Sequence, residues 1–231
     1  MPAPVSIIIP TLNAAPVLPA TLSALFEGMA EGVVHEVIIV DGGSDDATAA
    51  MAEDAGAVVL NHAPGRGGQL AAGAAAARAP WLLFLHADSQ PDPGWSAAVL
   101  AHVMAGHGTE QPAAAFRLAF DDTALMARVT AGWANLRSRI FALPYGDQGL
   151  LLSRARYQAV GGFDPMPLME DVAMARKLRR IVLLPVRVTT SGARYRKRGW
   201  IRQGAGNLWR LVRYLLGAAP DTLARGYRRL R

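Results

Sequence analysis

EVIIVDGGS, residues 36–44, is the stretch that decides the fold. Its aliphatic run predicts a strand buried on both faces, as in a parallel sheet covered by helices. The run ends at Asp41, and two glycines follow, which allow the backbone to turn sharply and to approach a ligand closely. Ser44 or Asp45 can then cap a helix, so the bare motif is equally typical of a capped turn and of a ligand-binding loop.

The same pattern repeats on both sides of this stretch. Strands are predicted at Val5–Thr11, Glu36–Val40, Val58–Leu60 and Trp81–Leu85. Helices are predicted between them at Val17–Met29, Asp45–Ala55 and Gly65–Arg78. This alternation predicts a parallel sheet with helices on both faces, right-handed crossovers and a ligand site at the carboxyl ends of the strands.

The alternation of strands and helices is less regular in the second half of the chain. Further helices are predicted at Trp95–Met104, Ala124–Phe141, Asp171–Arg180, Trp200–Leu216 and Asp221–Leu230, and further strands at Ala113–Phe120, Gly149–Leu152 and Val182–Val188. We expect one domain over residues 1–193 and a basic helical extension, residues 194–231, that packs on it.

Composition narrows the class of protein. The chain has 231 residues, 52 % of them hydrophobic, and no cysteine. It can therefore build a full α/β core, and disulfides and thiolate metal sites are excluded. No apolar run reaches the roughly 18 residues that a membrane-spanning helix needs. The N-terminus also lacks the charged and apolar regions of a signal peptide, so we expect a cytoplasmic protein.

Charge is distributed unevenly along the chain. Residues 194–231 contain 11 Lys and Arg against the single Asp221, whereas residues 1–193 contain 13 Lys and Arg against 17 acidic residues. Such a tail is suited to an anionic membrane surface, a phosphorylated ligand or nucleic acid. The helix predicted at Trp200–Leu216 is amphipathic. It can lie on the inner face of the membrane, pack on its own domain, or pack on a second subunit of a homodimer.

Three shorter motifs each allow a structural and a functional interpretation. GRGGQ, residues 65–69, opens a helix and can bind an anion, or it is a flexible turn. GDQG, residues 146–149, is a tight turn or the wall of a pocket that faces an acceptor. Glu170 and Asp171 open a helix, where acidic residues complement the helix dipole, or one of them is a general base.

Four motifs in order indicate a family. SIIIPTLN at Ser6–Asn13, VIIVDGGSDDAT at Val37–Thr48, LFLHAD at Leu83–Asp88 and GGFDPMPLMED at Gly161–Asp171 resemble the family 2 glycosyltransferases, over about residues 4 to 190. The resemblance implies the GT-A fold, a Rossmann-like nucleotide-binding α/β architecture. Its sheet is mixed but mainly parallel and is flanked by helices. GRGGQ, HAD, GDQG and PLMED look like a bacterial subgroup of small, single-domain members.

The resemblance also implies the roles of individual residues. Asp171 corresponds to the catalytic base of inverting members, and Glu170 would orient it or help to bind the acceptor. The residues expected to contact the nucleotide-sugar donor, most commonly a UDP-sugar, are Pro10, Thr11, Asn13, Asp41, Arg66, Gln69, Ala87 and Asp88. Asp147 and Gln148 would line the acceptor pocket. Arg194, Arg196 and Arg198 would contact the diphosphate.

A divalent metal, Mg²⁺ or Mn²⁺, is the cofactor that the resemblance implies. Asp88 matches the last carboxylate of the family's Asp-x-Asp motif, and His86 stands where many relatives have an acid. His86 can ligate Mn²⁺, hydrogen-bond the diphosphate or be structural. Because hard cations prefer oxygen ligands, we favour the last two roles and expect one protein carboxylate on the metal. Since His86 and Asp88 are two residues apart, their side chains could point to the same side of the strand.

Two other classes of function remain open from the residues alone. A sugar-phosphate nucleotidyltransferase typically has a glycine-rich basic loop after its first strand, and TLNAAPVL at Thr11–Leu18 has neither glycine nor a basic residue. A non-catalytic nucleotide or nucleic-acid binder would use the basic tail and its aromatic residues. Nucleic acid is the less favoured partner, and the sequence does not name the acceptor.

Overall fold

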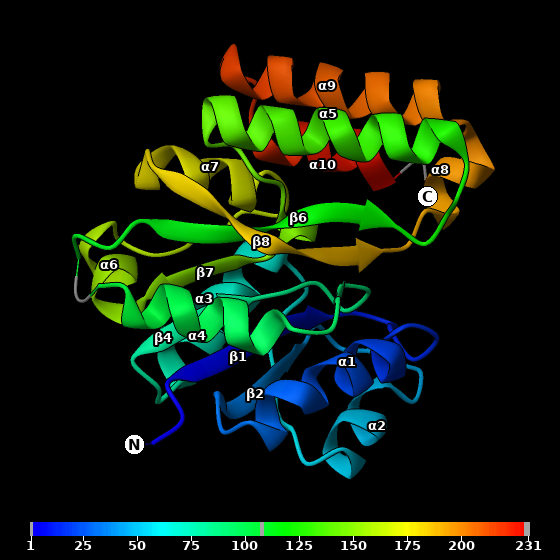
Figure 1. The fold of residues 1–231 in the computed structure, drawn as a ribbon. Coiled ribbons are helices and arrows are strands. Elements are labelled where there is room, and N and C mark those ends of the chain that lie inside the picture. The colour runs from blue at the N-terminus through cyan, green and yellow to red at the C-terminus, as the bar shows by residue number, and fades with distance from the viewer. Residues whose placement is uncertain (1, 107–108, 229–231) are drawn as a thin grey trace.

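The computed structural model describes residues 2–106 and 109–228, shown as a ribbon in Figure 1. Within this part of the chain, eight strands form one sheet in the order β3-β2-β1-β4-β7-β6-β8-β5. The strands are β1 (Val5–Thr11), β2 (Val34–Asp41), β3 (Val58–Asn61), β4 (Trp81–Phe84), β5 (Gln90–Pro91), β6 (Ala113–Phe120), β7 (Leu150–Ser153) and β8 (Ile181–Thr190). The seven predicted strands are all present within a few residues of their predicted bounds, and only the short β5 was not predicted.

The sheet is parallel in its first half and mixed in its second. β1 pairs in parallel with both β2 and β4, and β2 pairs in parallel with β3. β7 then runs antiparallel to β4 and β6, β8 is parallel to β6, and β5 is antiparallel to β8. The prediction of a mixed, mainly parallel sheet is confirmed.

The helices follow the predicted order, with additions. They are α1 (Leu18–Ala30), α2 (Thr48–Asp54), α3 (Arg66–Ala76), α4 (Trp95–Met104), α5 (Leu125–Phe141), α6 (Arg154–Ala159), α7 (Glu170–Leu178), α8 (Ala193–Arg198), α9 (Trp200–Leu215) and α10 (Pro220–Arg228), with a 3₁₀ helix η1 (Gly146–Gln148). The short helices α6, α8 and η1 were not predicted. The last two residues of the helix predicted at Asp221–Leu230 lie outside the described residues.

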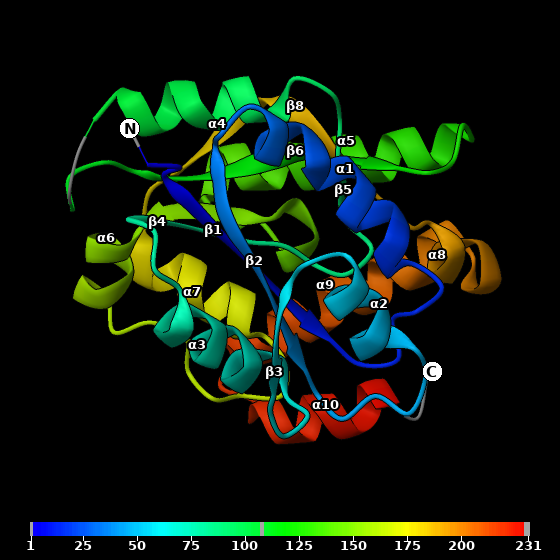
Figure 2. The same cartoon turned by 90° about the horizontal axis from the view of Figure 1, so that it is seen from below.

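The aliphatic runs of the central strands bury both of their faces. Ile7 and Ile39 belong to a core cluster shared with α1, α2 and α4, whereas Ile8 and Ile38 belong to a second cluster shared with α3 and α7. This alternation follows from the two-residue period of a strand. Figure 2, seen from below, shows helices on both sides of β1 and β2. The middle of β1 and β2 is therefore apolar on both faces, whereas the buried Ser6 and Glu36 near their starts bond each other, Ser6 Oγ donating to Glu36 Oε1 at 2.7 Å.

The antiparallel entry of β7 determines where the active-site loops meet. Phe84, the last residue of β4, pairs with Leu150, the first residue of β7. The chain leaving β4 therefore runs beside the segment that leads into β7, which is η1. This register brings His86 and Asp88 next to Gly146 and Asp147, although some 60 residues separate them in the sequence.

The C-terminal helices lie along one side of the molecule. α9 lies beside α5 at the top of Figure 1, with α10 beneath them in this view. α5 itself packs on β6 and β8. Among the described residues, no helix has both the length and the hydropathy needed to cross a membrane.

Candidate active site

The carboxylate of Asp41 organises the loop after β2. One of its oxygens accepts hydrogen bonds from Thr11 Oγ1 at 2.9 Å and Ser44 Oγ at 2.6 Å. The other accepts from the backbone N–H groups of Gly43 at 3.0 Å and Ser44 at 2.7 Å. Burial opposes ionisation, but these hydrogen bonds outweigh it and hold the pKa of Asp41 below its usual value. If Asp41 binds the nucleobase or the ribose of a donor, that hydrogen bond would have to replace the bond from one of these donors.

The loops after β1 and β2 are joined by hydrogen bonds in both directions. Asn13 N donates to Ser44 Oγ at 2.8 Å, and Asp45 N donates to Asn13 Oδ1 at 3.0 Å. Asn13 has a positive φ of 52°, a conformation that asparagine tolerates better than most residues. Together with Pro10 and Thr11 in β1, Asn13 thus lies on a fixed double loop at the carboxyl edge of the sheet.

Gln69 connects the start of α3 to both of these strands. Its Nε2 donates to the carbonyl oxygens of Thr11 at 2.9 Å and Val40 at 2.7 Å, and its Oε1 accepts from Gly65 N at 3.2 Å. The side chain is buried, so its amide serves the framework of the loop in this structure. The predicted contact of Gln69 with the nucleotide would therefore be indirect, through the position of the loop.

Arg66 and Gly67 connect α3 to the segment that carries the two candidate catalytic acids. Arg66 Nη1 lies 3.9 Å from Glu170 Oε1, at the N-terminus of α7. Gly67 N donates to Met166 O at 3.2 Å, and a Cβ at Gly67 would collide with the backbone of Asp164 and Met166. The glycines of GRGGQ are thus needed for a close backbone approach, not only for flexibility.

His86 and Asp88 lie in a turn beyond the end of β4 and not in a strand, as the prediction about their side chains assumed. β4 ends at Phe84, and Ser89 N donates to His86 O at 3.1 Å, which closes a turn over residues 86–89. The two-residue period of a strand therefore does not apply to this pair. Within the turn, the carbonyl oxygen of Ala87 accepts a hydrogen bond from Thr21 Oγ1 at 2.7 Å.

His86 is held among positive charges and against Gly146. Burial, and then the charges of Arg66 and Arg194, keep the pKa of His86 well below its usual range, so the imidazole is neutral near pH 7. A Cβ at Gly146 would collide with the imidazole ring. Neutral imidazole beside two arginines is suited to hydrogen-bonding an anionic group, in line with the structural or diphosphate roles favoured above.

The four residues of the GDQG motif, residues 146–149, have different structural roles. Gly146 N donates to Asp171 Oδ2 at 2.8 Å and so fixes that carboxylate. Gln148 is 0 % exposed, and it binds Ser138 Oγ at 2.6 Å and Phe116 O at 3.1 Å. The prediction that Gln148 lines the acceptor pocket does not fit this geometry, because its amide ties η1 to α5 and β6. Gly149, at φ 64°, allows the close approach of Leu85.

Asp147 carries a buried carboxyl group on which the charges of Asp171 and Asp88 act. Its Oδ1 is buried and has no hydrogen-bond partner in the described part of the chain. Burial raises the pKa of Asp147 to about 6; Arg137 lowers it, and the charges of Asp171 and Asp88 raise it further. Asp88, Asp147 and Asp171 are therefore electrostatic neighbours. A buried carboxyl oxygen of this kind is suited to accept a hydrogen bond from a substrate hydroxyl.

Arg137 and Tyr145 belong to the site and were not identified from the sequence. Arg137 is 8 % exposed, its guanidinium carbon lies 3.5 Å from the Tyr145 ring centroid, and its Nη2 is buried with no hydrogen-bond partner among the described residues. Its Nε donates to Leu143 O at 3.0 Å. The only signal in the sequence was an arginine among small residues on the buried side of a helix.

Glu170 and Asp171 open α7 at the mouth of a pocket. Tyr145, His86 and Gly146 line the same pocket, with apolar residues from α3, β4 and β7 behind them. Glu170 is 3 % exposed, and its Oε2 is buried and unpaired among the described residues. Burial, and then the charge of Asp171, raise the pKa of Glu170 to about 7 against a lowering by Arg66. Glu170 therefore keeps its proton much more readily than an ordinary glutamate does.

The three arginines after β8 lie in different surroundings. Arg196 Nη1 pairs with Asp121 Oδ1 at 2.9 Å and with Asp122 Oδ2 at 3.4 Å, on the surface. The charge of Arg194 lowers the pKa of His86, whereas the charge of Arg198 lowers the pKa of Arg210 on α9. Of the three, Arg194 is the one whose charge reaches the end of β4. The predicted diphosphate contact of Arg196 would require its two ion pairs to break.

Asp88 is a half-buried oxygen ligand that is available to a cation. Its carboxylate makes no side-chain hydrogen bond or ion pair within the described residues. No group of three or more His, Asp or Glu side chains that could hold a metal forms in residues 2–106 and 109–228. The donor set therefore fits a hard cation held by one carboxylate and completed by ligand oxygens, and it does not form a closed metal site.

The raised pKa of Glu170 predicts how stability depends on pH. As pH rises from about 4.5 to 7, the unfolded chain loses this proton while the folded protein retains it, so the free energy of unfolding falls. The full loss is about 3 kcal/mol at most. Glu170→Gln removes this titration. In urea unfolding at pH 5 and pH 8, we expect the variant to gain stability relative to the wild type at the higher pH. If the free energies of unfolding of the variant and the wild type change in parallel with pH, Glu170 is not buried as described.

Comparisons with known proteins agree with this geometry. A family model described as "Glycosyl transferase family 2" matches residues 6–158. An uncharacterized glycosyltransferase of Mycobacterium tuberculosis is 28 % identical over 94 % of this chain and 86 % of its own length. A PGL/p-HBAD biosynthesis glycosyltransferase of the same organism is 39 % identical over 69 % of this chain and 62 % of its own length.

Solved structures share the fold at low sequence identity. Residues 1–349 of Staphylococcus aureus TarS superpose with a TM-score of 0.62 at 15 % identity, covering 96 % of this chain and 69 % of that one. Glucosyl-3-phosphoglycerate synthase from Mycobacterium tuberculosis, with Mn²⁺, UDP and glucosyl-3-phosphoglycerate, gives a TM-score of 0.56 at 20 % identity, covering 79 % and 70 %. These matches confirm the predicted GT-A architecture, and the family model covers well over half of the chain. The chain belongs to glycosyl transferase family 2 and is a glycosyltransferase.

Proposed function

We propose that this protein transfers a sugar from a UDP-sugar to an acceptor hydroxyl with inversion, and that Asp171 is the general base. The observation that carries the proposal is the hydrogen bond of 2.8 Å from Gly146 N to Asp171 Oδ2. It fixes a carboxylate at the carboxyl edge of the sheet, beside the ends of β4 and η1, where parallel α/β sheets bind their ligands.

The surroundings of Asp171 suit it to take a proton from an acceptor. Its neighbour Glu170 has its pKa raised to about 7, so near neutral pH a large fraction of Glu170 carries a proton and cannot itself accept one. A hydroxyl in the pocket beside Tyr145 can give its proton to Asp171 while its oxygen attacks the anomeric carbon. The bond from that carbon to the phosphate oxygen breaks in the same displacement.

The positive groups around His86 can stabilise the departing diphosphate. Arg66 and Arg194 both lower the pKa of His86, which indicates that both guanidinium groups lie near the end of β4. Their fixed charges can stabilise the negative charge that develops on the leaving group. Asp147, with its unpaired Oδ1, is placed to accept a hydrogen bond from a hydroxyl of either substrate.

Neighbouring structures support UDP as the nucleotide of the donor. TarS was solved with UDP-GlcNAc, and glucosyl-3-phosphoglycerate synthase was solved with UDP and Mn²⁺. The uncommitted carboxylate of Asp88 makes it the residue to hold Mg²⁺ or Mn²⁺ in this protein. When bound there, the ion would neutralise part of the diphosphate charge.

The role of Asp171 can be tested by Asp171→Asn. The amide cannot take a proton, so we expect kcat to fall by about 10² to 10⁴ while UDP affinity stays within about twofold. UDP release from a panel of UDP-sugars measures the first quantity, and calorimetry with UDP measures the second. Asp164→Asn is the matched control, because Asp164 is exposed and pairs with Lys177. Unchanged turnover in Asp171→Asn would refute the assignment.

The metal assignment predicts a difference between Asp88→Asn and His86→Asn. In the wild type, Mn²⁺ should increase the thermal stabilisation that UDP provides, since a ligand that binds only the folded state raises its stability. We expect this increment to disappear in Asp88→Asn and to persist in His86→Asn, measured by thermal shift with UDP alone and with Mn²⁺. The reverse pattern would make the imidazole the ligand and contradict the proposal.

A further inference from the structure

Helix α5 is amphipathic in the opposite sense to a normal surface helix. The side chains that it buries are small or polar, among them Ala127, Ala131 and Ala134. Its outward side carries large apolar residues, each at least 47 % exposed: Leu125, Val129, Trp133, Leu136 and Ile140. A helix of a globular protein usually turns its apolar stripe to the core. The outward stripe of α5 therefore lacks a partner within the described chain.

Helix α9 shows the same inversion. Its inward side buries Leu211 and also carries a polar network. In this network Gln203 donates to Asn207 at 3.1 Å, Asn207 donates to Tyr195 at 3.0 Å and Arg210 donates to Asn207 at 2.6 Å. On its outward side, and at Leu216 directly after it, the apolar residues are between 47 % and 81 % exposed: Ile201, Leu208, Trp209, Leu215 and Leu216.

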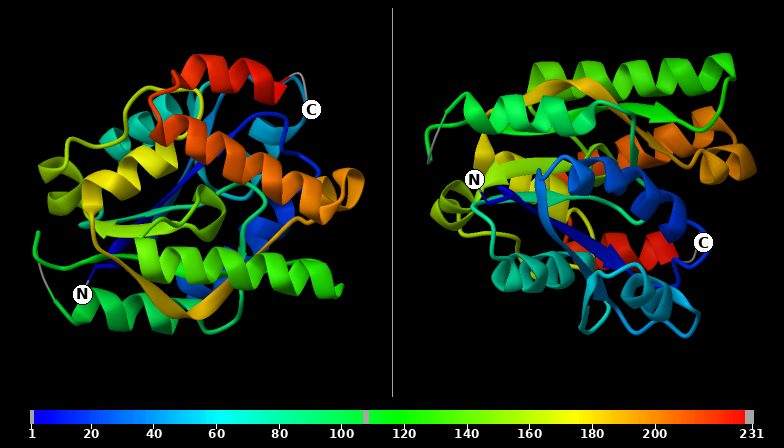
Figure 3. Two further views of the ribbon diagram at one scale, coloured as in Figure 1. Left: turned by 90° about the horizontal axis from the view of Figure 1, so that it is seen from above. Right: turned by 60° about the horizontal axis from the view of Figure 1, so that its bottom comes forward.

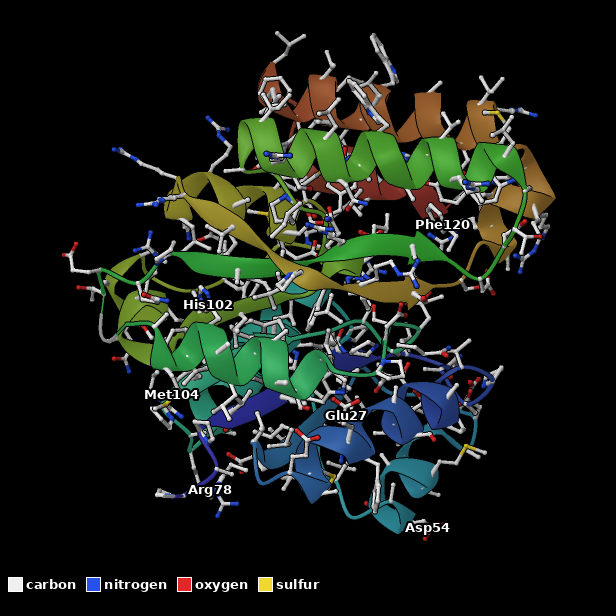
Figure 4. The ribbon with its side chains drawn as sticks, in the orientation of Figure 1. Glu27, Asp54, Arg78, His102, Met104 and Phe120 are labelled. Atoms are coloured by element: carbon white, nitrogen blue, oxygen red, sulfur yellow. The ribbon has the colours of Figure 1, made fainter. Side chains whose placement is uncertain are left out.

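The two helices lie on the same side of the molecule, and we call the ten apolar residues just named the α5–α9 face. α5 and α9 contact each other, and Figure 3 (left), seen from above, shows both helices on the upper side of the molecule. Side chains stand out from the top of the molecule in Figure 4. Exposed apolar patches of this extent mark an interaction site.

The charge of the α5–α9 face favours one kind of partner. Neither helix contains an acidic residue, and both expose arginines beside the apolar stripe, Arg128 and Arg139 on α5 and Arg202 and Arg213 on α9. A second copy docked face to face would place arginines against arginines. Tryptophan and leucine interspersed with arginine are instead typical of helices that lie in a lipid–water interface.

We propose that the α5–α9 face docks on the surface of an anionic lipid bilayer, with the apolar side chains in the interface and the arginines at the level of the headgroups. The docking does not depend on the proposed sugar transfer. The inward sides of the same helices carry Arg137 and Arg210, whose charges both act on Tyr145 beside Asp171. The inner sides of both helices therefore adjoin the Tyr145 side of the pocket, where Arg137 lies 3.5 Å from the ring centroid.

Flotation of the full-length protein with vesicles tests the proposal. We expect binding to vesicles of phosphatidylcholine with phosphatidylglycerol to be at least about tenfold stronger than to phosphatidylcholine alone, and to weaken as salt is raised. The triple variants Ile201→Gln/Trp209→Gln/Leu216→Gln on α9 and Val129→Gln/Trp133→Gln/Ile140→Gln on α5 should each lower the affinity at least about tenfold.

The matched control removes exposed apolar side chains from other surfaces. Phe26 on α1 is 68 % exposed and Met104 on α4 is 57 % exposed, so Phe26→Gln/Met104→Gln should float like the wild type. Absence of wild-type binding to either vesicle would overturn the proposal. So would a dimer, seen by analytical ultracentrifugation, that the α9 variant dissociates while vesicle binding is unchanged. The wild-type comparison of the two vesicles stands even if a variant fails to fold.

Discussion

The hydrogen bond from Gly146 N to Asp171 is the interaction on which the site depends. It joins the loop before β7 to the N-terminus of α7, and the missing side chain of Gly146 leaves room for His86 from the end of β4. These three segments meet because β7 runs antiparallel to β4, with Leu150 opposite Phe84. A fully parallel sheet would carry η1 to the opposite edge. The mixed topology is therefore a requirement of the active site.

The strands and most helices could be predicted because their signals are local. Val5–Thr11 and Ala113–Phe120 were predicted to the residue, since aliphatic runs bounded by polar segments specify buried strands. Side-chain partners could not be predicted in the same way. Gln69 and Gln148 look like ligand residues in the sequence, yet each binds backbone carbonyl oxygens of distant strands. Arg137 enters the site only through the packing of α5 on β6.

The inversion of α5 and α9 is the clearest case in which sequence pattern and burial must be considered together. Periodicity alone predicts amphipathic helices with an apolar side, and it places that side against the protein by default. Here mainly alanines and polar groups face inward, with Leu211 of α9 as the buried large apolar residue, and most of the large apolar residues face solvent. The polar network of α9 adjoins Tyr145 and Asp147. One pair of helices thus lies beside the candidate site on its inner side and carries the proposed docking surface on its outer side.

The stereochemistry of donor cleavage tests most directly whether Asp171 acts as the base of a single displacement. Water can replace the acceptor in slow hydrolysis, and the anomeric proton of the released sugar is followed by NMR with whichever UDP-sugar is turned over. A base that activates the attacking oxygen on the face opposite the nucleotide predicts that the inverted anomer appears first and then mutarotates. Initial release of the retained anomer would contradict the single displacement and the role of Asp171.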